Sequence, residues 1–210
     1  MTDGFLRQSP LDPLGLESRN RADRGEAGVG LAEAPYRGIV NLRGDVADGA
    51  FTAAFESVFG FALPEVPNTV AGEGDVTAFW LGPDEWWVTV PGPDPLAGPE
   101  LAERLRKAFG ELFVAVTDVS ESRTCLRVSG PKAATVLQKG CPLDFHPGVF
   151  APGTCAQSHM AKATVVFHRL ADAGDEDSVF ELYVLRSFAE YLWTWIEDAA
   201  REFGVAVVEG

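Results

Sequence analysis

Basic residues are scarce in this chain of 210 residues. It carries 17 lysines and arginines against 31 aspartates and glutamates, which gives a net charge of −14. Affinity for nucleic acid comes largely from lysine and arginine side chains that neutralise phosphates, and anionic membrane surfaces attract the same side chains. The composition therefore disfavours both nucleic acid and a membrane as partners.

Long apolar runs and cysteines are also few. No stretch approaches the ~20 apolar residues that a membrane-spanning helix needs, and the first 20 residues lack the pattern of a signal peptide. The three cysteines are an odd number and lie far apart in the sequence: Cys125, Cys141 and Cys155. Because disulfides belong to oxidising compartments, we expect a cytoplasmic protein with free thiols.

The usual catalytic and cofactor-binding motifs are missing as well. No glycine-rich phosphate loop follows a predicted strand, and no serine stands in a nucleophile elbow. His146, His159 and His168 lack the spacing of a helical metal site, and Cys141 follows a helix C-terminus, where the dipole disfavours a thiolate. We therefore expect no catalytic, cofactor-binding or metal-binding residue on this chain, and Cys141 and Cys125 as buried apolar residues.

What the sequence does contain is one pattern used twice. A predicted helix ends at Phe109 and Gly110 and precedes the apolar run 113–116, and another ends at Phe203 and Gly204 before the run 205–208. The two helix ends, Phe109 and Phe203, are 94 residues apart (203 − 109 = 94). Solenoid repeats have much shorter periods, of ~20–50 residues. The pattern indicates a single supersecondary module that occurs twice.

Both copies predict the element order β-α-β-β-α-β, which is the ferredoxin-like order. The first copy has strands at 39–42, 76–81, 85–90 and 113–119, and its two helices end at Gly60 and Gly110. The second has strands at 124–128, 164–167, 179–185 and 205–208, a helix that ends at Gly140, an acidic loop at 172–177, and a helix with a capping box of Ser187 and Glu190. We expect an α+β fold of two tandem ferredoxin-like modules, 36–120 and 121–210, packed as one body.

The segment 1–35 has no sustained period, and we expect an irregular N-terminal arm. Within it, Pro10 and Pro13 forbid a helix interior, while Leu11, Leu14 and Leu16 favour burial. Two interpretations stay open here: a disordered tail, or an extended arm that packs its leucines on a partner.

Tryptophans crowd the predicted hairpin of the first module, at Trp80, Trp86 and Trp87. Successive strand residues point to opposite faces, so Trp86 and Trp87 cannot both enter the same core. One of them is either buried elsewhere within this chain or serves as an interface anchor, a role in which tryptophan is enriched.

Several segments together resemble the gamma subunit of heterotetrameric sarcosine oxidase. The most specific is Arg186-Ser187-Phe188-Ala189-Glu190-Tyr191-Leu192-Trp193. The other segments that carry the resemblance follow in order along the chain: 9–11, 80–86, 118–124, 129–131, 139–144 and 152–157.

The resemblance implies a complex with alpha, beta and delta subunits. Such a complex demethylates sarcosine oxidatively to glycine, forms hydrogen peroxide and passes the one-carbon unit to tetrahydrofolate. It also implies that FAD, FMN, NAD, tetrahydrofolate and zinc are held by the partner subunits and none by gamma. With the missing motifs, this leads us to expect a non-catalytic structural and assembly subunit.

The family is similar in turn to the folate-binding body of the glycine-cleavage aminomethyltransferase. By that resemblance, Asp144 is the counterpart of an aspartate that contacts folate. A lone carboxylate can equally cap the turn that follows it. The alternative hypothesis is therefore a folate-binding one-carbon-transfer protein that uses Asp144.

Overall fold

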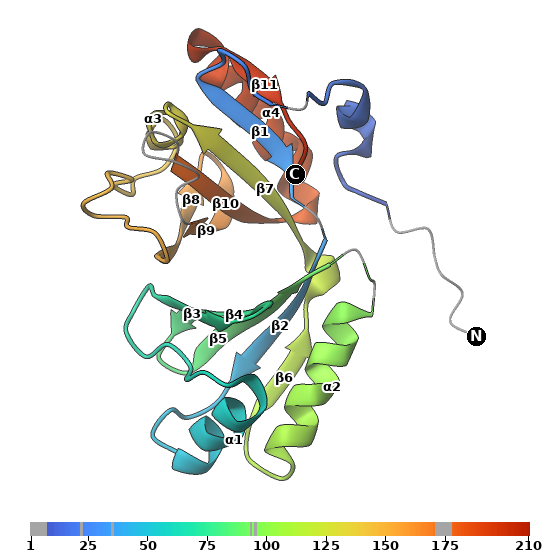
Figure 1. The fold of residues 1–210 in the computed structure, drawn as a ribbon, viewed down its shortest axis with the longest axis vertical. Coiled ribbons are helices and arrows are strands. Elements are labelled where there is room, and N and C mark those ends of the chain that lie inside the picture. Colours follow the sequence, from blue (N-terminus) through green and yellow to red (C-terminus); the bar gives the residue numbers. More distant parts are fainter. Residues whose placement is uncertain (1–7, 22, 35, 93, 95, 171–177) are drawn as a thin grey trace. The chain divides into compact units, whose positions relative to one another are not determined.

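The computed structural model describes residues 8–210 except 22, 35, 93, 95 and 171–177 (Figure 1). The acidic loop 172–177 thus lies outside the described residues. The chain forms two compact units. The central unit comprises 35–122 and 153–157, and the terminal unit comprises 1–34, 123–152 and 158–210.

The central unit contains a five-stranded sheet in the order β3-β4-β5-β2-β6. Its strands are β2 (Arg37–Arg43), β3 (Val70–Glu73), β4 (Val76–Gly82), β5 (Glu85–Pro91) and β6 (Ala115–Asp118). Without the edge strand β3, this is the ferredoxin-like order, in which the first strand lies between the third and the fourth. β2 pairs antiparallel with both β5 and β6.

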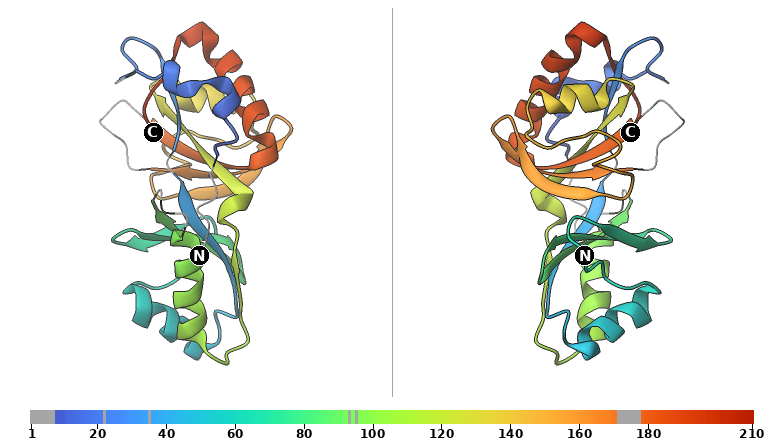
Figure 2. Two further views of the ribbon diagram at one scale, coloured as in Figure 1. Left: turned by 90° about the vertical axis from the view of Figure 1, so that its right-hand side faces the viewer. Right: turned by 90° about the vertical axis from the view of Figure 1, so that its left-hand side faces the viewer.

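Helices α1 (Gly49–Phe59) and α2 (Ala97–Phe109) cover one face of this sheet (Figure 2). They end as the sequence predicts, at Gly60 and Gly110, and Gly60 has the positive φ of 79° that favours glycine. Phe51 of α1 stacks on Phe109 of α2 with ring centroids 5.1 Å apart. The periodic apolar positions of both helices thus form the core of the central unit.

The terminal unit contains a six-stranded sheet in the order β11-β1-β7-β10-β9-β8. Its strands are β1 (Val29–Glu33), β7 (Arg123–Gly130), β8 (Cys155–Met160), β9 (Ala163–Arg169), β10 (Ser178–Leu185) and β11 (Val205–Val207). Residues 155–157, the first half of β8, are counted with the central unit. The order again follows the ferredoxin-like pattern, with β8 added at one edge and β1 inserted between β11 and β7. The predicted α+β class with two ferredoxin-like modules is confirmed.

Strand β1 corrects the expectation that residues 1–35 are irregular. β1 pairs in parallel with β11 and antiparallel with β7, and so lies between two strands of the second module (Figure 1). A side chain at Gly30 would place its Cβ 2.7 Å from the hydroxyl oxygen of Ser129, so glycine permits this close pairing. The module limits 36–120 and 121–210 stay a prediction.

Helices α3 (Ala133–Gln138) and α4 (Ala189–Ala200) belong to the terminal unit. The core includes a cluster of phenylalanines in which Phe145 lies 5.3–5.5 Å from the rings of Phe150, Phe167 and Phe180. The predicted capping box at Ser187 is wrong. The chain makes a 3-10 turn at Arg186–Phe188, which places Phe188 at the N-cap with no side-chain cap.

The described part of the arm packs on the terminal unit of its own chain. Residues Asp12–Leu14 and Leu16–Ser18 form two 3-10 turns, and Leu11 is fully buried. The hydroxyl of Ser9 lies 2.6 Å from both carboxylate oxygens of Glu33. These described residues are thus not a disordered tail, and Leu11 packs on its own chain. Leu14 and Leu16 are half-buried, and the packing of the arm on a partner stays a prediction.

Trp86 and Trp87, the two adjacent tryptophans of the hairpin, are both buried. Trp86 enters the core of the central unit, where its indole N–H donates to the carbonyl of Pro64 at 2.8 Å. Trp87, on the opposite face of the strand, is only 4% exposed. Burial within the chain is thus the observed arrangement for both.

No helix among the described residues has the length and apolar character to cross a membrane.

We predict that Leu11→Ala lowers the free energy of unfolding by about 2–5 kcal/mol, the usual cost of deleting a buried leucine side chain. Urea unfolding followed by circular dichroism measures the change. The matched control is Leu96→Ala, because Leu96 is 47% exposed and surface substitutions usually stay within about 0.5 kcal/mol. Equal effects of the two substitutions would contradict the anchoring role of the arm.

Candidate functional site

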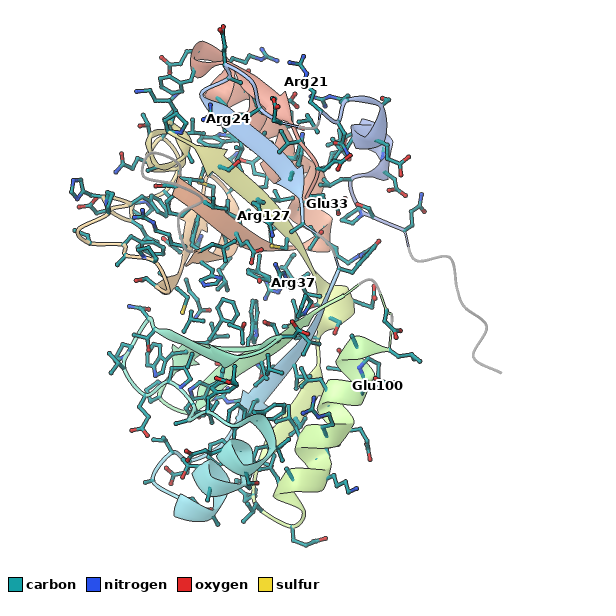
Figure 3. All side chains as sticks on the ribbon, viewed as in Figure 1. Arg21, Arg24, Glu33, Arg37, Glu100 and Arg127 are labelled. Atoms are coloured by element: carbon teal, nitrogen blue, oxygen red, sulfur yellow. The ribbon has the colours of Figure 1, made fainter. Side chains whose placement is uncertain are left out.

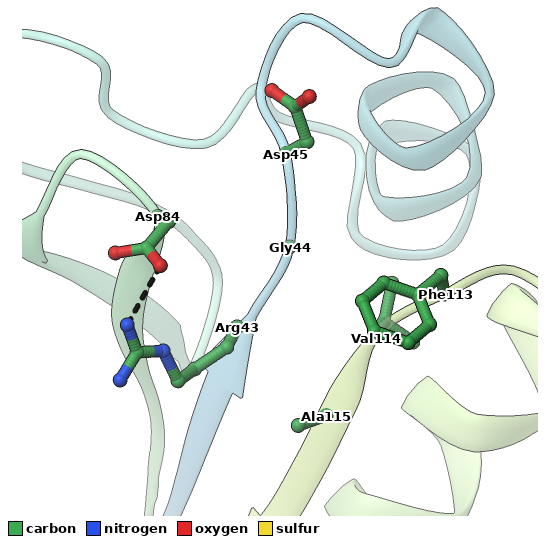
Figure 4. A pocket seen from close by; sticks show the side chains of 7 residues that line it. All are labelled: Arg43, Gly44, Asp45, Asp84, Phe113, Val114 and Ala115. Atoms are coloured by element: carbon green, nitrogen blue, oxygen red, sulfur yellow. Dashed lines mark hydrogen bonds and ion pairs between the residues drawn. The ribbon is translucent and has the colours of Figure 1, made fainter.

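A pocket of about 620 Å³ opens at one end of the central sheet (Figure 4). Three separate segments line it: the end of β2 with the turn after it, the β4–β5 turn, and the start of β6. The lining residues are Arg43, Gly44, Asp45, Asp84, Phe113, Val114 and Ala115.

The charged side chains of the pocket are largely paired. Arg43 Nη2 lies 2.6 Å from Asp84 Oδ2, and its Nη1 lies 3.9 Å from Glu85 Oε2. The hydrogen bond and charge of Asp84, with the charge of Glu85, raise the pKa of Arg43 above its usual value. Asp45 Oδ1 accepts a hydrogen bond from the backbone N–H of Ala47 at 2.9 Å. The arrangement leaves a net negative charge at the rim.

The apolar side of the pocket ends in an exposed aromatic ring. Phe113 has a relative exposure of 103%, which means that its side chain contacts almost nothing else in the chain. Val114, its neighbour, packs instead against the core of the central unit. The pocket offers an apolar contact surface and carboxylates, and no cysteine, serine or histidine lines it.

Asp144, the candidate folate contact, lies exposed in the loop after α3. Its Oδ1 accepts a hydrogen bond from the backbone N–H of His146 at 2.9 Å. His146 Nδ1 accepts in turn from the N–H of Gly148 at 3.1 Å. Asp144 therefore caps the following turn, one of the two roles that the sequence leaves open.

A buried polar cluster lies on three neighbouring strands of the terminal sheet. Glu181 of β10 accepts hydrogen bonds from Arg127 and from the hydroxyl of Tyr183, both at 2.9 Å. His168 of β9 has its Nδ1 3.9 Å from the same carboxylate. Arg127 lies on β7, on the other side of β10 from His168 (Figure 3). The strand register places both Arg127 and His168 directly opposite Glu181.

The sequence missed both the pocket and this cluster. Neither has a local motif, since the pocket joins segments far apart in the chain and the cluster depends on strand register. The only sequence signal for the cluster is the presence of charged residues inside apolar strands, at Arg127, His168 and Glu181. Charged residues are seldom buried unless they are paired.

All three cysteines are buried and none forms a disulfide, in agreement with the expectation for Cys141 and Cys125. Cys155 Sγ lies 3.5 Å from the carbonyl oxygens of Thr69 and Trp80. Burial raises the pKa of its thiol to about 12, so it is protonated at neutral pH. The described residues contain no group of three or more histidine, cysteine, aspartate or glutamate side chains that can hold a metal ion.

Comparison with known proteins gives a consistent result. The sarcosine oxidase, gamma subunit family matches residues 43–202. Sarcosine oxidase subunit gamma from Corynebacterium sp. (strain P-1) is 34% identical over 201 residues, which cover 94% of this chain and 92% of that protein.

Two solved structures are similar to the fold. A chain of heterotetrameric sarcosine oxidase from Corynebacterium sp. U-96 in complex with pyrrole 2-carboxylate has a TM-score of 0.81 at 31% identity, covering 97% of this chain and 99% of its own. Glycine cleavage system aminomethyltransferase T from Bartonella henselae has a TM-score of 0.69 at 15% identity, covering 97% and 59%, and thus shares the fold. Because the family match spans well over half of the sequence and the identity exceeds 30% over nearly its full length, this chain belongs to the sarcosine oxidase gamma subunit family.

Proposed function

We propose that this chain is a non-catalytic structural and assembly subunit of a heterotetrameric sarcosine oxidase. Its partners are alpha, beta and delta subunits, and the complex demethylates sarcosine oxidatively to glycine with formation of hydrogen peroxide. The one-carbon unit passes to tetrahydrofolate. The observation that carries this proposal is the likeness to a chain of a heterotetrameric sarcosine oxidase over 97% of this chain and 99% of that one.

The geometry of the chemistry-bearing side chains supports a non-catalytic role. Catalytic groups need access to substrate and protonation states matched to their task. Asp144 and His146 hold a turn together, and Cys155 is a buried thiol with a pKa of about 12. Glu181 is occupied by Arg127 and Tyr183. We therefore propose that no residue of this chain is catalytic or binds a cofactor or metal.

The same proposal assigns the cofactors to the partners. FAD, FMN, NAD, tetrahydrofolate and zinc are held by the other subunits, and the complex works in the cytoplasm. The three thiols of this chain form no disulfide, which fits a reducing compartment.

A second candidate function follows from the shared fold of aminomethyltransferase T. In this alternative, the chain binds a reduced folate and Asp144 contacts it. The exposed position of Asp144 after α3 favours this candidate. However, one of its carboxylate oxygens already accepts the His146 N–H, and fold alone does not imply function.

We predict that the isolated chain is colourless, inactive and prone to aggregate, and that co-expression with the alpha, beta and delta subunits yields a stoichiometric complex. Affinity purification through a tag on this chain, followed by native mass spectrometry and flavin absorbance, measures both outcomes. Turnover of sarcosine by the isolated chain, or flavin that co-purifies with it alone, would refute the non-catalytic role. Recovery of a stable monomer that does not co-purify with the co-expressed subunits would refute the assembly role.

We predict no saturable binding of a reduced folate to the isolated chain, measured by titration calorimetry. Asp144→Asn removes the carboxylate charge without breaking the turn, because an amide oxygen can still accept the His146 N–H. The matched control is Asp23→Asn, since Asp23 also accepts a backbone N–H two residues on, from Gly25 at 2.8 Å. Saturable binding that Asp144→Asn abolishes and Asp23→Asn leaves intact would favour the folate-binding candidate instead.

A further inference from the structure

Phe113 is the most exposed large apolar side chain in the described part of the protein, at 103%. It lies between the end of α2 and the start of β6, on the wall of the pocket. A phenylalanine ring in water forfeits the favourable free energy of burial. A single exposed apolar residue is ordinary, but here the ring adjoins a pocket that can accept a second apolar group against it.

The free edge of the central sheet limits how a partner can approach. Among the described residues, β6 pairs with β2 and forms the edge of the sheet, and such edges favour pairing with an added strand. Arg106 Nη2, however, donates to the carbonyl oxygen of Val116 at 3.0 Å and so occupies a backbone acceptor in β6. A bound partner segment is therefore expected at the Phe113 end, with a side chain in the pocket, and not as a strand along β6.

The charges around the pocket select the chemistry of that segment. Arg43 is paired with Asp84 and faces Glu85, so it has little attraction left for an acidic partner. Asp45 has one carboxylate oxygen engaged in its turn, and the chain as a whole carries −14. Opposite charges across an interface steer association, so the pocket favours a basic neighbour.

We propose that this pocket receives a large apolar side chain, flanked by lysine or arginine, from a partner subunit of the complex. In the bound state Phe113 packs against that side chain, and the flanking cation lies near Asp45. The inference rests on the proposed function, because it takes the occupant from the partner subunits. It adds to that function a specific contact surface and the kind of segment that fits it.

The test compares variants of this chain that are co-expressed with the partner subunits. Phe113→Asp and Phe113→Ala should raise the dissociation rate of the complex on dilution at least about tenfold, as expected for an aromatic hot spot. Val66→Asp and Val66→Ala are the matched controls, because Val66 is a 65% exposed residue of the same unit that does not line the pocket. These controls should assemble and dissociate like the wild type.

Charge is tested separately with Asp45→Lys. This variant should associate several times more slowly than the wild type at low salt, and the difference should shrink at 0.5 M NaCl because salt screens exposed charges. The circular dichroism spectra of the Phe113 variants should match the wild type, since this side chain is fully exposed.

The outcomes separate this inference from the proposed function. If Phe113→Asp assembles and dissociates like the wild type while the wild type co-purifies with its partners, the pocket assignment is wrong and the proposed function stands. If the wild type itself fails to co-purify, both are wrong. If Phe113→Asp instead abolishes self-association of the isolated chain and leaves the complex intact, the occupant is a second copy of this chain, which also overturns the inference.

Discussion

The terminal unit depends on the pairing of β1 between β11 and β7. Residues Val29, Gly30 and Leu31 pair with 205–207 of β11, while 30–33 pair with 126–129 of β7. Without β1, both neighbours would present unpaired backbone groups, which are costly when buried. Segments near the two ends of the chain must therefore come together before this sheet can be complete.

The N-terminal arm adds further contacts within the terminal unit. Ser9 binds Glu33 at the end of β1, and Thr124 of β7 donates to the same carboxylate at 3.1 Å. Arg19 forms an ion pair with Glu197 of α4, and Leu11 is buried. Ser9 and Arg19 thus join the arm to β1 and α4 of the terminal unit. Because Leu11 is already buried, the arm has less apolar surface available for a partner.

The two modules differ because of this insertion. In the central unit β2 pairs directly with β6, whereas the equivalent strands β7 and β11 are separated by β1. An inserted strand between two antiparallel strands must be parallel to one of them, and β1 is parallel to β11.

The sequence predicted α1, α2 and the β4–β5 hairpin because their apolar periods and glycine stops are clear. It missed β1, β3 and β8 because glycine, alanine and polar residues dilute their patterns, and strand pairing in the fold decides their state. The pocket was beyond prediction, since its wall joins 43–45, Asp84 and 113–115 only after the sheet has formed.

Several side chains that could carry chemistry make hydrogen bonds within the fold. Asp45 and Asp144 lie in different units, yet each accepts a hydrogen bond from the backbone N–H two residues on, at 2.9 Å. Such bonds replace water around the carboxylate and fix the turn, which leaves fewer lone pairs for a ligand. Glu181 accepts side-chain hydrogen bonds from Arg127 on the neighbouring strand β7 and from Tyr183 on its own strand β10. The likeness to aminomethyltransferase T therefore argues for a common scaffold, because fold alone does not imply function and function resides in the side chains of a site.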